Sequence, residues 1–213
     1  MNNTMKKLRN IIAVAVLLIA GTYTAQAQKG ELKLDLNYNY SLPLGSFKND
    51  LINKGSATGG NGSLQYFITD KWAVGLGAGY QNFDQKYPRA LYQLDKTQTV
   101  SAVLTNSVEV TPVVAKATFL PLANKSFVQP YITVGAGAGI VNFNQYLGEF
   151  TSTSKNSASF TAQGGAGVMI PFGKLSSSGV QIGADYSYLP YNNFGYKNLN
   201  TVNFHTGVFF PLR

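Results

Sequence analysis

The strongest constraint on the fold is one segment in which polar and apolar residues alternate without exception. From Glu31 to Tyr40 the sequence reads E-L-K-L-D-L-N-Y-N-Y. Because successive side chains of a β-strand point to opposite faces, the leucines and tyrosines share one face, and Lys33, Asp35 and the asparagines share the other. The segment therefore predicts a strand with one apolar and one polar face.

Weaker copies of this alternation follow along the chain and bring the number of predicted strands to eight. Each is near the roughly 9–11 residues that a tilted membrane-spanning strand needs. The apolar faces of the seven further segments run over residues 64–68, 72–80, 113–119, 132–140, 160–170, 180–188 and 202–212.

The polar faces of these segments decide between a soluble and a membrane protein. They consist mostly of Gly, Gln, Asn, Ser and Thr, and only 12% of the chain is charged. A soluble barrel turns its apolar face inward and covers its exterior with charged residues, whereas a narrow lumen needs small or uncharged side chains. We therefore predict an all-β fold, an eight-stranded antiparallel up-and-down transmembrane β-barrel. A soluble periplasmic barrel is the alternative.

The connections between the predicted strands alternate between long and short. Long connections are expected at residues 41–58, 84–106, 144–156 and 190–198, and short ones at residues 69–71, 121–126 and 173–179. Outer-membrane barrels have short periplasmic turns and longer extracellular loops. The alternation therefore predicts which end of the barrel faces the outside of the cell.

The N-terminal segment has the features of a secretory signal peptide. Lys6, Lys7 and Arg9 precede a short apolar run from Ile11 to Ala20, and Ala25-Gln26-Ala27 resembles a cleavage site. The apolar run is too short for a spanning helix, although an uncleaved anchor is the alternative. We expect a signal peptide over residues 1–27, a barrel domain over 28–213, and export to the cell outer membrane.

Several function classes lack the residues that they require. The net charge of +8 includes three basic residues in the predicted signal peptide, and the others are scattered, so no nucleic-acid partner is expected. The chain has no Cys and a single His, His205, which leaves almost no material for thiol nucleophiles or zinc sites. Glycines at every second position, as in Gly75 to Gly79, suit a crowded lumen rather than a nucleotide loop. We expect no catalytic residue, metal or cofactor.

Five ionisable residues are predicted to face the lumen: Lys33, Asp35, Lys116, Asp185 and His205. A charge inside a narrow barrel is costly unless it is paired or hydrated. These residues could form a structural ion network that fills the barrel, or a gate that breaks and re-forms to pass ions. An eight-stranded barrel is just wide enough for side chains to fill, which favours the filled lumen.

Aromatic residues near the predicted strand ends are expected to form girdles at the two membrane interfaces. Ordinary strand preference of aromatic residues is the alternative explanation. The candidates are Tyr40, Trp72, Tyr80, Tyr131, Phe160, Tyr186, Tyr188 and Phe210.

Three stretches, at residues 42–47, 66–72 and 130–137, resemble the small outer-membrane β-barrel domain family, which includes OmpX-like, OmpW-like and OmpA-barrel proteins. The C-terminal pattern formed by His205, Gly207, Phe210 and Leu212 is similar to the last-strand signal that the outer-membrane assembly machinery reads. The resemblance implies outer-membrane lipid and this machinery as partners.

The expected function is a structural or surface-interaction role with a largely filled lumen. Extracellular loops, including residues 87–89 and 151–159, would form the surface for an extracellular partner, and the barrel is expected to be a monomer. A small pore or an OmpW-like conduit for ions or small apolar molecules is the alternative. A lipid-modifying enzyme built around His205 is a third and weaker one.

Overall fold

The computed structural model describes residues 30–95, 98–122, 127–148, 150–173, 177–193 and 196–212. The predicted signal peptide, residues 1–27, lies outside these residues, so it stays a prediction. Within the described ranges, no helix combines the length and the apolar character that crossing a membrane would take.

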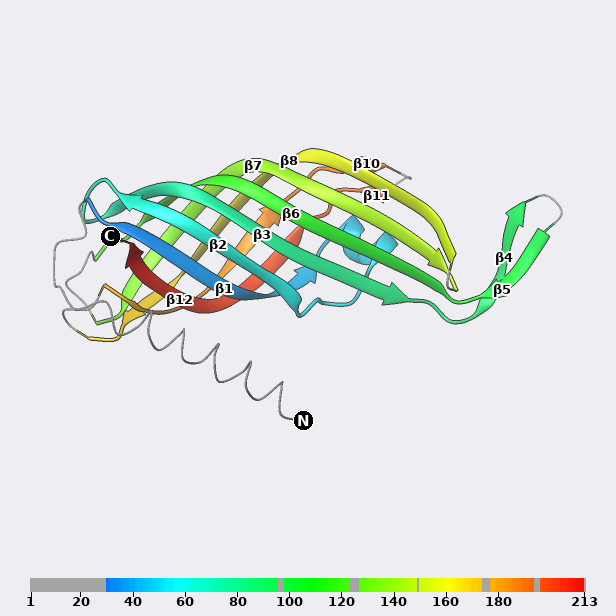
Figure 1. The fold of residues 1–213 in the computed structure, drawn as a ribbon, viewed down its shortest axis with the longest axis horizontal. Coiled ribbons are helices and arrows are strands. Elements are labelled where there is room, and N and C mark those ends of the chain that lie inside the picture. Colours follow the sequence, from blue (N-terminus) through cyan, green and yellow to red (C-terminus); the bar gives the residue numbers. More distant parts are fainter. Residues whose placement is uncertain are drawn as a thin grey trace.

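Eight antiparallel strands close into a barrel, as predicted (Figure 1). Each strand pairs with its neighbours in the chain, and the first and last strands close the sheet from Leu32–Leu212 to Pro43–Thr201. The barrel strands are β1 (Leu32–Pro43), β2 (Thr58–Phe67), β3 (Trp72–Lys86), β6 (Leu104–Phe119), β7 (Gln129–Leu147), β8 (Phe150–Pro171), β9 (Gly179–Tyr188) and β12 (Thr201–Leu212).

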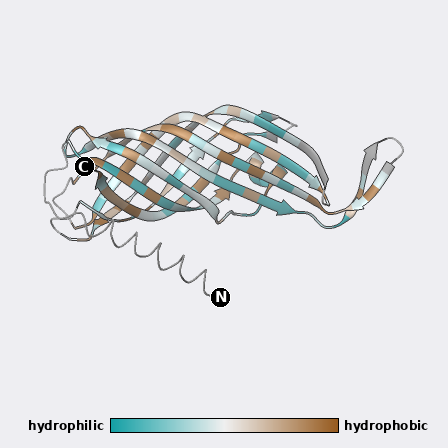
Figure 2. Cartoon of the chain, viewed as in Figure 1, coloured by the Kyte–Doolittle hydropathy of each residue, from teal (hydrophilic) through white to brown (hydrophobic). Residues whose placement is uncertain are grey.

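The outer surface of the barrel carries the apolar residues that the alternation placed there. The apolar side chains of Leu76 and Ile132, for example, are 66% and 54% exposed. In Figure 2 brown residues recur along the strands around the body of the barrel. Large exposed apolar residues would be costly in water but are expected where a barrel faces lipid.

The barrel wall is much taller on one side. β7 has 19 residues and β8 has 22, whereas β9 has 10. Because β9 pairs with β8 only from Ala162 to Pro171, the described residues Phe150–Thr161 have a strand partner on one side only, in β7. The sheet therefore continues beyond the closed barrel as an extended wall with an open edge.

The extended wall corrects one sequence-based expectation. Residues 144–156 were expected to form a loop, but β7 and β8 run through most of this range and meet at a turn at Gly148, where φ is +66°. Residues 144–156 contain few apolar residues and these do not recur at every second position, so the range lacks the alternation by which strands were recognised.

The other long connections contain small elements of their own. The first holds a helical turn, η1 (Phe47–Leu51). The second holds a hairpin of β4 (Ala90–Asp95) and β5 (Gln98–Ala102), which projects away from the barrel (Figure 1). The last holds the short pair β10 (Asn192–Asn193) and β11 (Tyr196–Lys197).

Candidate functional site: the barrel interior

The inward face of the barrel forms three layers. An apolar cluster lies at the end with the short turns, a second apolar cluster lies at the end with the long connections, and polar side chains line the space between them. The strands contribute to these layers the residues opposite the outward-facing ones, because side chains alternate across a strand.

The cluster at the short-turn end surrounds a buried lysine. Phe67 and Phe209 are 1% exposed, and they pack with Leu120 and Met169. The Lys33 ammonium lies 4.7 Å from the ring centroid of Phe67 and 5.5 Å from that of Phe209. It also lies 3.5 Å from a carboxylate oxygen of Glu31 at the rim. Cation–π attraction and this ion pair compensate the loss of water around the ammonium, so Lys33 can lie within an apolar cluster.

Asp35 lies one inward position above Lys33 and is held by polar neighbours. Its Oδ2 accepts hydrogen bonds from the Ser63 hydroxyl at 2.7 Å and from the Gln65 amide at 2.5 Å. Lys33 and Lys116 both interact with this carboxylate electrostatically. A buried carboxylate is tolerated when it has such partners.

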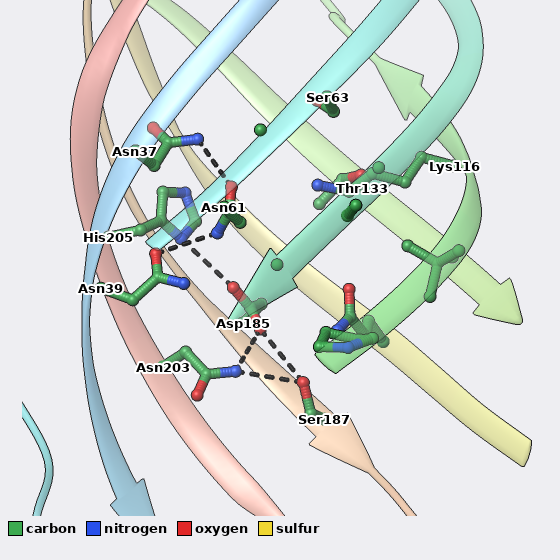
Figure 3. A pocket seen from close by; sticks show the side chains of 18 of the residues that line it. Asn37, Asn39, Asn61, Ser63, Lys116, Thr133, Asp185, Ser187, Asn203 and His205 are labelled. Carbon is green, nitrogen blue, oxygen red and sulfur yellow. Dashed lines mark hydrogen bonds and ion pairs between the residues drawn. The ribbon is translucent and has the colours of Figure 1, made fainter. Parts of the chain in front are cut away.

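A second polar group crosses the barrel from β7 to β12. The Tyr131 hydroxyl lies 2.7 Å from Nε2 of His205, and Nδ1 of His205 lies 3.2 Å from Oδ1 of Asp185. Asn203 donates to Oδ2 of Asp185 at 2.7 Å. A neutral imidazole satisfies both of its contacts when Nδ1 donates to Asp185 and Nε2 accepts from Tyr131. Figure 3 shows His205, Asp185 and Asn203 connected around the cavity.

Two glycines make room for this group. A Cβ built on Gly167 or on Gly183 would lie 2.6 Å from the Tyr131 hydroxyl, and one on Gly183 would lie 2.7 Å from Nε2 of His205. The two glycines face each other across β8 and β9. Gly167 and Gly183 therefore allow polar side chains to reach across the barrel.

The polar layer lines a cavity with a volume of about 90 Å³. That is room for several waters. The walls include Asn37, Asn61, Lys116 and Thr133, which point into it (Figure 3). Among the described residues, no group of three or more His, Asp or Glu side chains could hold a metal ion.

The first long connection folds into the mouth of the barrel and plugs it. Phe47, Leu51 and Ile52 are at most 1% exposed. They pack on inward-facing residues of β3, β6 and β7 and of the connection between β9 and β12: Phe83, Val108, Val141, Phe143, Leu189, Tyr191 and Leu199. The Phe47 and Phe83 rings meet edge to face with centroids 5.0 Å apart.

Polar contacts fix the plug to two sides of the mouth, the segment before β12 and the end of β3. The Leu44 amide donates to the Asn200 carbonyl at 2.9 Å, and the Tyr87 hydroxyl donates to the Leu51 carbonyl at 2.8 Å. The Asn53 amide donates to the Gln85 side chain at 2.6 Å. The plug is thus anchored as well as packed.

The plug was missed by sequence analysis, which treated residues 41–58 as an ordinary loop. Its apolar residues Phe47 and Leu51 are four positions apart, as on one face of a helix. That spacing was the available indication, but it does not say that the helical turn bends into the barrel.

The five predicted lumen residues all face inward, in two groups. Lys33, Asp35 and Lys116 interact on one side, while Asp185 and His205 meet at 3.2 Å on the other. Within the described ranges, Lys116 has no carboxylate oxygen within 4 Å.

The prediction that Tyr131 belongs to an aromatic girdle is wrong. Tyr131 is 5% exposed and points into the lumen, because it occupies an odd-numbered, inward position on β7 next to the outward Ile132. Six others are exposed on the outer surface, where their role as a girdle stays a prediction: Tyr40, Trp72, Tyr80, Phe160, Tyr186 and Tyr188.

A closed eight-stranded barrel with an apolar exterior and a polar interior agrees with the family comparison. The family model of the outer membrane protein beta-barrel domain matches residues 11–210. The chain belongs to this family. Membership implies that the barrel lies in the outer membrane, with its exposed apolar residues in the lipid bilayer.

Solved structures of other members of this architecture are similar in fold. Neisserial surface protein A is 15% identical, with a TM-score of 0.51 over 85% of this chain and 96% of that one. OprG of Pseudomonas aeruginosa is 13% identical, with a TM-score of 0.50 over 88% of this chain and 100% of its own. Ail of Yersinia pestis is 17% identical, with a TM-score of 0.45 over 85% and 99%.

At such identities these likenesses concern the fold alone. Comparison with curated protein sequences gave no match. The function of this outer membrane β-barrel must therefore be argued from its own residues.

Proposed function

We propose that this outer-membrane barrel is a closed surface protein, whose role is structural or lies in contacts made outside the cell. The observation that carries the proposal is the closure of the lumen at both ends. The plug around Phe47 blocks the mouth, and the cluster around Lys33, Phe67 and Phe209 blocks the opposite end. A dry apolar layer is a barrier to ions and water.

Two structures beyond the membrane supply a surface for a partner. β8 continues ten residues past the outward Phe160, which is about 30 Å along the strand, and its open edge could accept hydrogen bonds. The β4–β5 hairpin projects further and carries Leu91, which is 76% exposed. Loops and extensions on a rigid scaffold are where binding functions usually lie.

Conductance in planar bilayers tests the closed lumen. The purified full-length barrel should insert without producing steady current, since each apolar layer must be crossed in turn. Steady conductance of the wild-type protein at low voltage would contradict the proposal. Gel mobility with and without boiling confirms that the inserted sample is folded.

Cysteine labelling tests the orientation. The chain has no native Cys, so Leu91→Cys on the hairpin and Asp70→Cys on a short turn give single labelling sites. A maleimide that cannot cross membranes should label Leu91→Cys in intact cells and label Asp70→Cys only after lysis. The reverse pattern would place the long connections in the periplasm and refute the surface role.

The same proposal includes the outer-membrane assembly machinery as a partner and a monomeric barrel. Gly207, Phe210 and Leu212 lie on β12, the last strand of the barrel, where the assembly machinery would read them. A closed barrel with no lumen shared between copies is expected to act as a monomer. Cross-linking in native membranes should yield a single-chain band.

An interruption in the barrel wall favours a conduit as the second candidate. β3 and β6 pair up to Ala78–Val113 and again from Gln81–Val110, but not at Pro112 between them, because proline has no N–H to donate. Pro112 and Gly79 also line the cavity. A small apolar molecule could leave the cavity sideways at this point.

Uptake of an apolar dye by intact cells tests this candidate. If the barrel is a conduit, its expression should accelerate uptake, and Pro112→Ala should slow it by restoring a donor to the wall. Equal uptake with and without the barrel would eliminate the conduit. The control is Pro43→Ala, at the end of β1, which leaves the wall at Pro112 unchanged.

A further inference from the structure

The outward side of the extended wall carries two rows of polar residues across four strands. The register of β3, β6, β7 and β8 aligns them side by side. We call this surface the polar wall face; its rows are Asn82, Glu109, Asn142 and Asn156, then Asp84, Ser107, Asn144 and Ser154.

The polar wall face is continuous with the lipid-facing surface. Two residues earlier on β3 lies Tyr80, and two earlier on β7 lies Ile140, both exposed on the outside of the barrel. In Figure 2 the strands become more hydrophilic along β3 toward its end. Whatever the outer leaflet carries above its acyl chains must lie against this face, because it occupies the same side of the same strands.

Hydrogen bonds hold these side chains in place along the wall. Asn82 donates to Asp84 at 2.6 Å, and Ser154 donates to Asn144 at 2.7 Å. Ser107 donates to Asn82 at 3.3 Å. All eight residues are exposed or half-buried, so each retains donors or acceptors that can reach a ligand. The side chains of the polar wall face are therefore held in place by hydrogen bonds and still offer donors and acceptors to a ligand.

The charges and hydrogen-bonding groups of the polar wall face favour one kind of lipid headgroup over another. Its eight residues include two carboxylates, Asp84 and Glu109, and no Lys, Arg or His, while Lys86 lies one row further along β3. Phosphate would be repelled by these carboxylates, whereas sugar hydroxyls can donate to carboxylates and both donate to and accept from amides. Tyr80 adjoins the face, two residues before Asn82 on the same side of β3, and offers a ring on which the C–H side of a sugar can stack.

We propose that the polar wall face binds the saccharide headgroup of the glycolipid in the outer leaflet of the barrel's own membrane. Amide and carboxylate groups of the two rows would hydrogen-bond to sugar hydroxyls, with Tyr80 as the stacking ring. This inference rests on the proposed extracellular position of the long connections, and it goes beyond that proposal by naming a lipid-borne sugar as the partner.

The test uses the full-length barrel in phosphatidylcholine nanodiscs. The probe is a core oligosaccharide released from lipopolysaccharide and freed of phosphate, and the measurement is the NMR shift of the side-chain amides of Asn142, Asn144 and Asn156. Saturable shifts are expected at these amides. The double variant Asn142→Leu with Asn144→Leu, followed at the remaining Asn156 amide, should weaken binding by about tenfold, because two hydrogen-bonding side chains are lost.

The matched control is Asn192→Leu, the same substitution at an exposed position on the β10–β11 connection, which should bind like the wild type. Absence of saturable shifts, or equal binding by the double variant, would overturn the proposal. Shifts produced instead by inorganic phosphate with Ca²⁺, and abolished by EDTA, would also overturn it. In nanodiscs both ends of the barrel are accessible, so saccharide binding does not depend on the orientation of the barrel in the cell. A negative binding result therefore leaves the cysteine-labelling test of orientation unaffected.

Discussion

The hydroxyl of Tyr131 on β7 lies 2.7 Å from Nε2 of His205 on β12, although β8 and β9 separate these strands in the sheet. The contact can form because the strands between them present Gly167 and Gly183 at this level of the lumen. A link across the barrel thus depends on two residues without side chains.

Gly183→Ala should destabilise the barrel. The added Cβ would lie 2.6 Å from the Tyr131 hydroxyl and 2.8 Å from the Ala166 carbonyl, so the interior must shift at a cost of about 1–3 kcal/mol. Reversible urea unfolding in lipid vesicles measures the change. The control is Gly164→Ala, where a Cβ meets nothing within 4 Å; an equal loss of stability there would refute the explanation.

Tyr131→Phe should cost about 1 kcal/mol of unfolding free energy, because the ring is retained while the buried His205 Nε2 loses its partner. The same urea titration measures it. Tyr188→Phe removes a hydroxyl from the outer surface and should change stability much less. If both variants behave alike, the interior hydrogen bond contributes nothing measurable.

Leu76→Arg should destabilise the barrel by about 2–4 kcal/mol, because an arginine on the lipid face near the bilayer midplane is costly. Leu91→Arg is the same substitution at a similarly exposed leucine, but on the projecting hairpin, where it should be nearly neutral. Folding yield and urea stability in vesicles measure both. A similar effect at the two positions would mean that exposure alone, rather than lipid contact, decides the outcome.

The two closures of the lumen should act in series. Phe47→Ala weakens the plug and Lys33→Ala weakens the opposite cluster, but either closure alone still blocks the path. We therefore expect planar-bilayer conductance only in the double variant. Conductance in one single variant would show that the other cluster is not a barrier.

Phe210→Ala should reduce the amount of folded barrel in the outer membrane severalfold, if the last strand is read during assembly. The measurement is the heat-modifiable band on gels of membrane fractions, compared with folding of the purified variant in vesicles. The control Phe204→Ala removes an exposed aromatic residue of the same strand. Equal losses in cells and in vesicles would indicate a stability defect rather than a recognition defect.

The lipid-embedded part of the fold could be predicted because lipid imposes a period of two. The alternation at Leu32 to Tyr40 assigned each residue to a face, and Lys33 and Asp35 lie inside as expected. The same rule failed for the tip of the β7–β8 hairpin, where apolar residues are few and no alternation marks the strands. The rule places Tyr131 inward, next to the outward Ile132, as observed. The girdle prediction was wrong for this residue because it followed the aromatic side chain and not the alternation.

The sequence by itself determined the strand count, the inward and outward faces, and the membrane class, since these depend on local periodicity. Only the tertiary structure decided what the interior does. The inward bend of Phe47 and Leu51, the placement of Lys33 between two rings, and the reach of Tyr131 to His205 all join residues far apart in the chain. Such contacts depend on strand register and barrel closure, which no local pattern specifies.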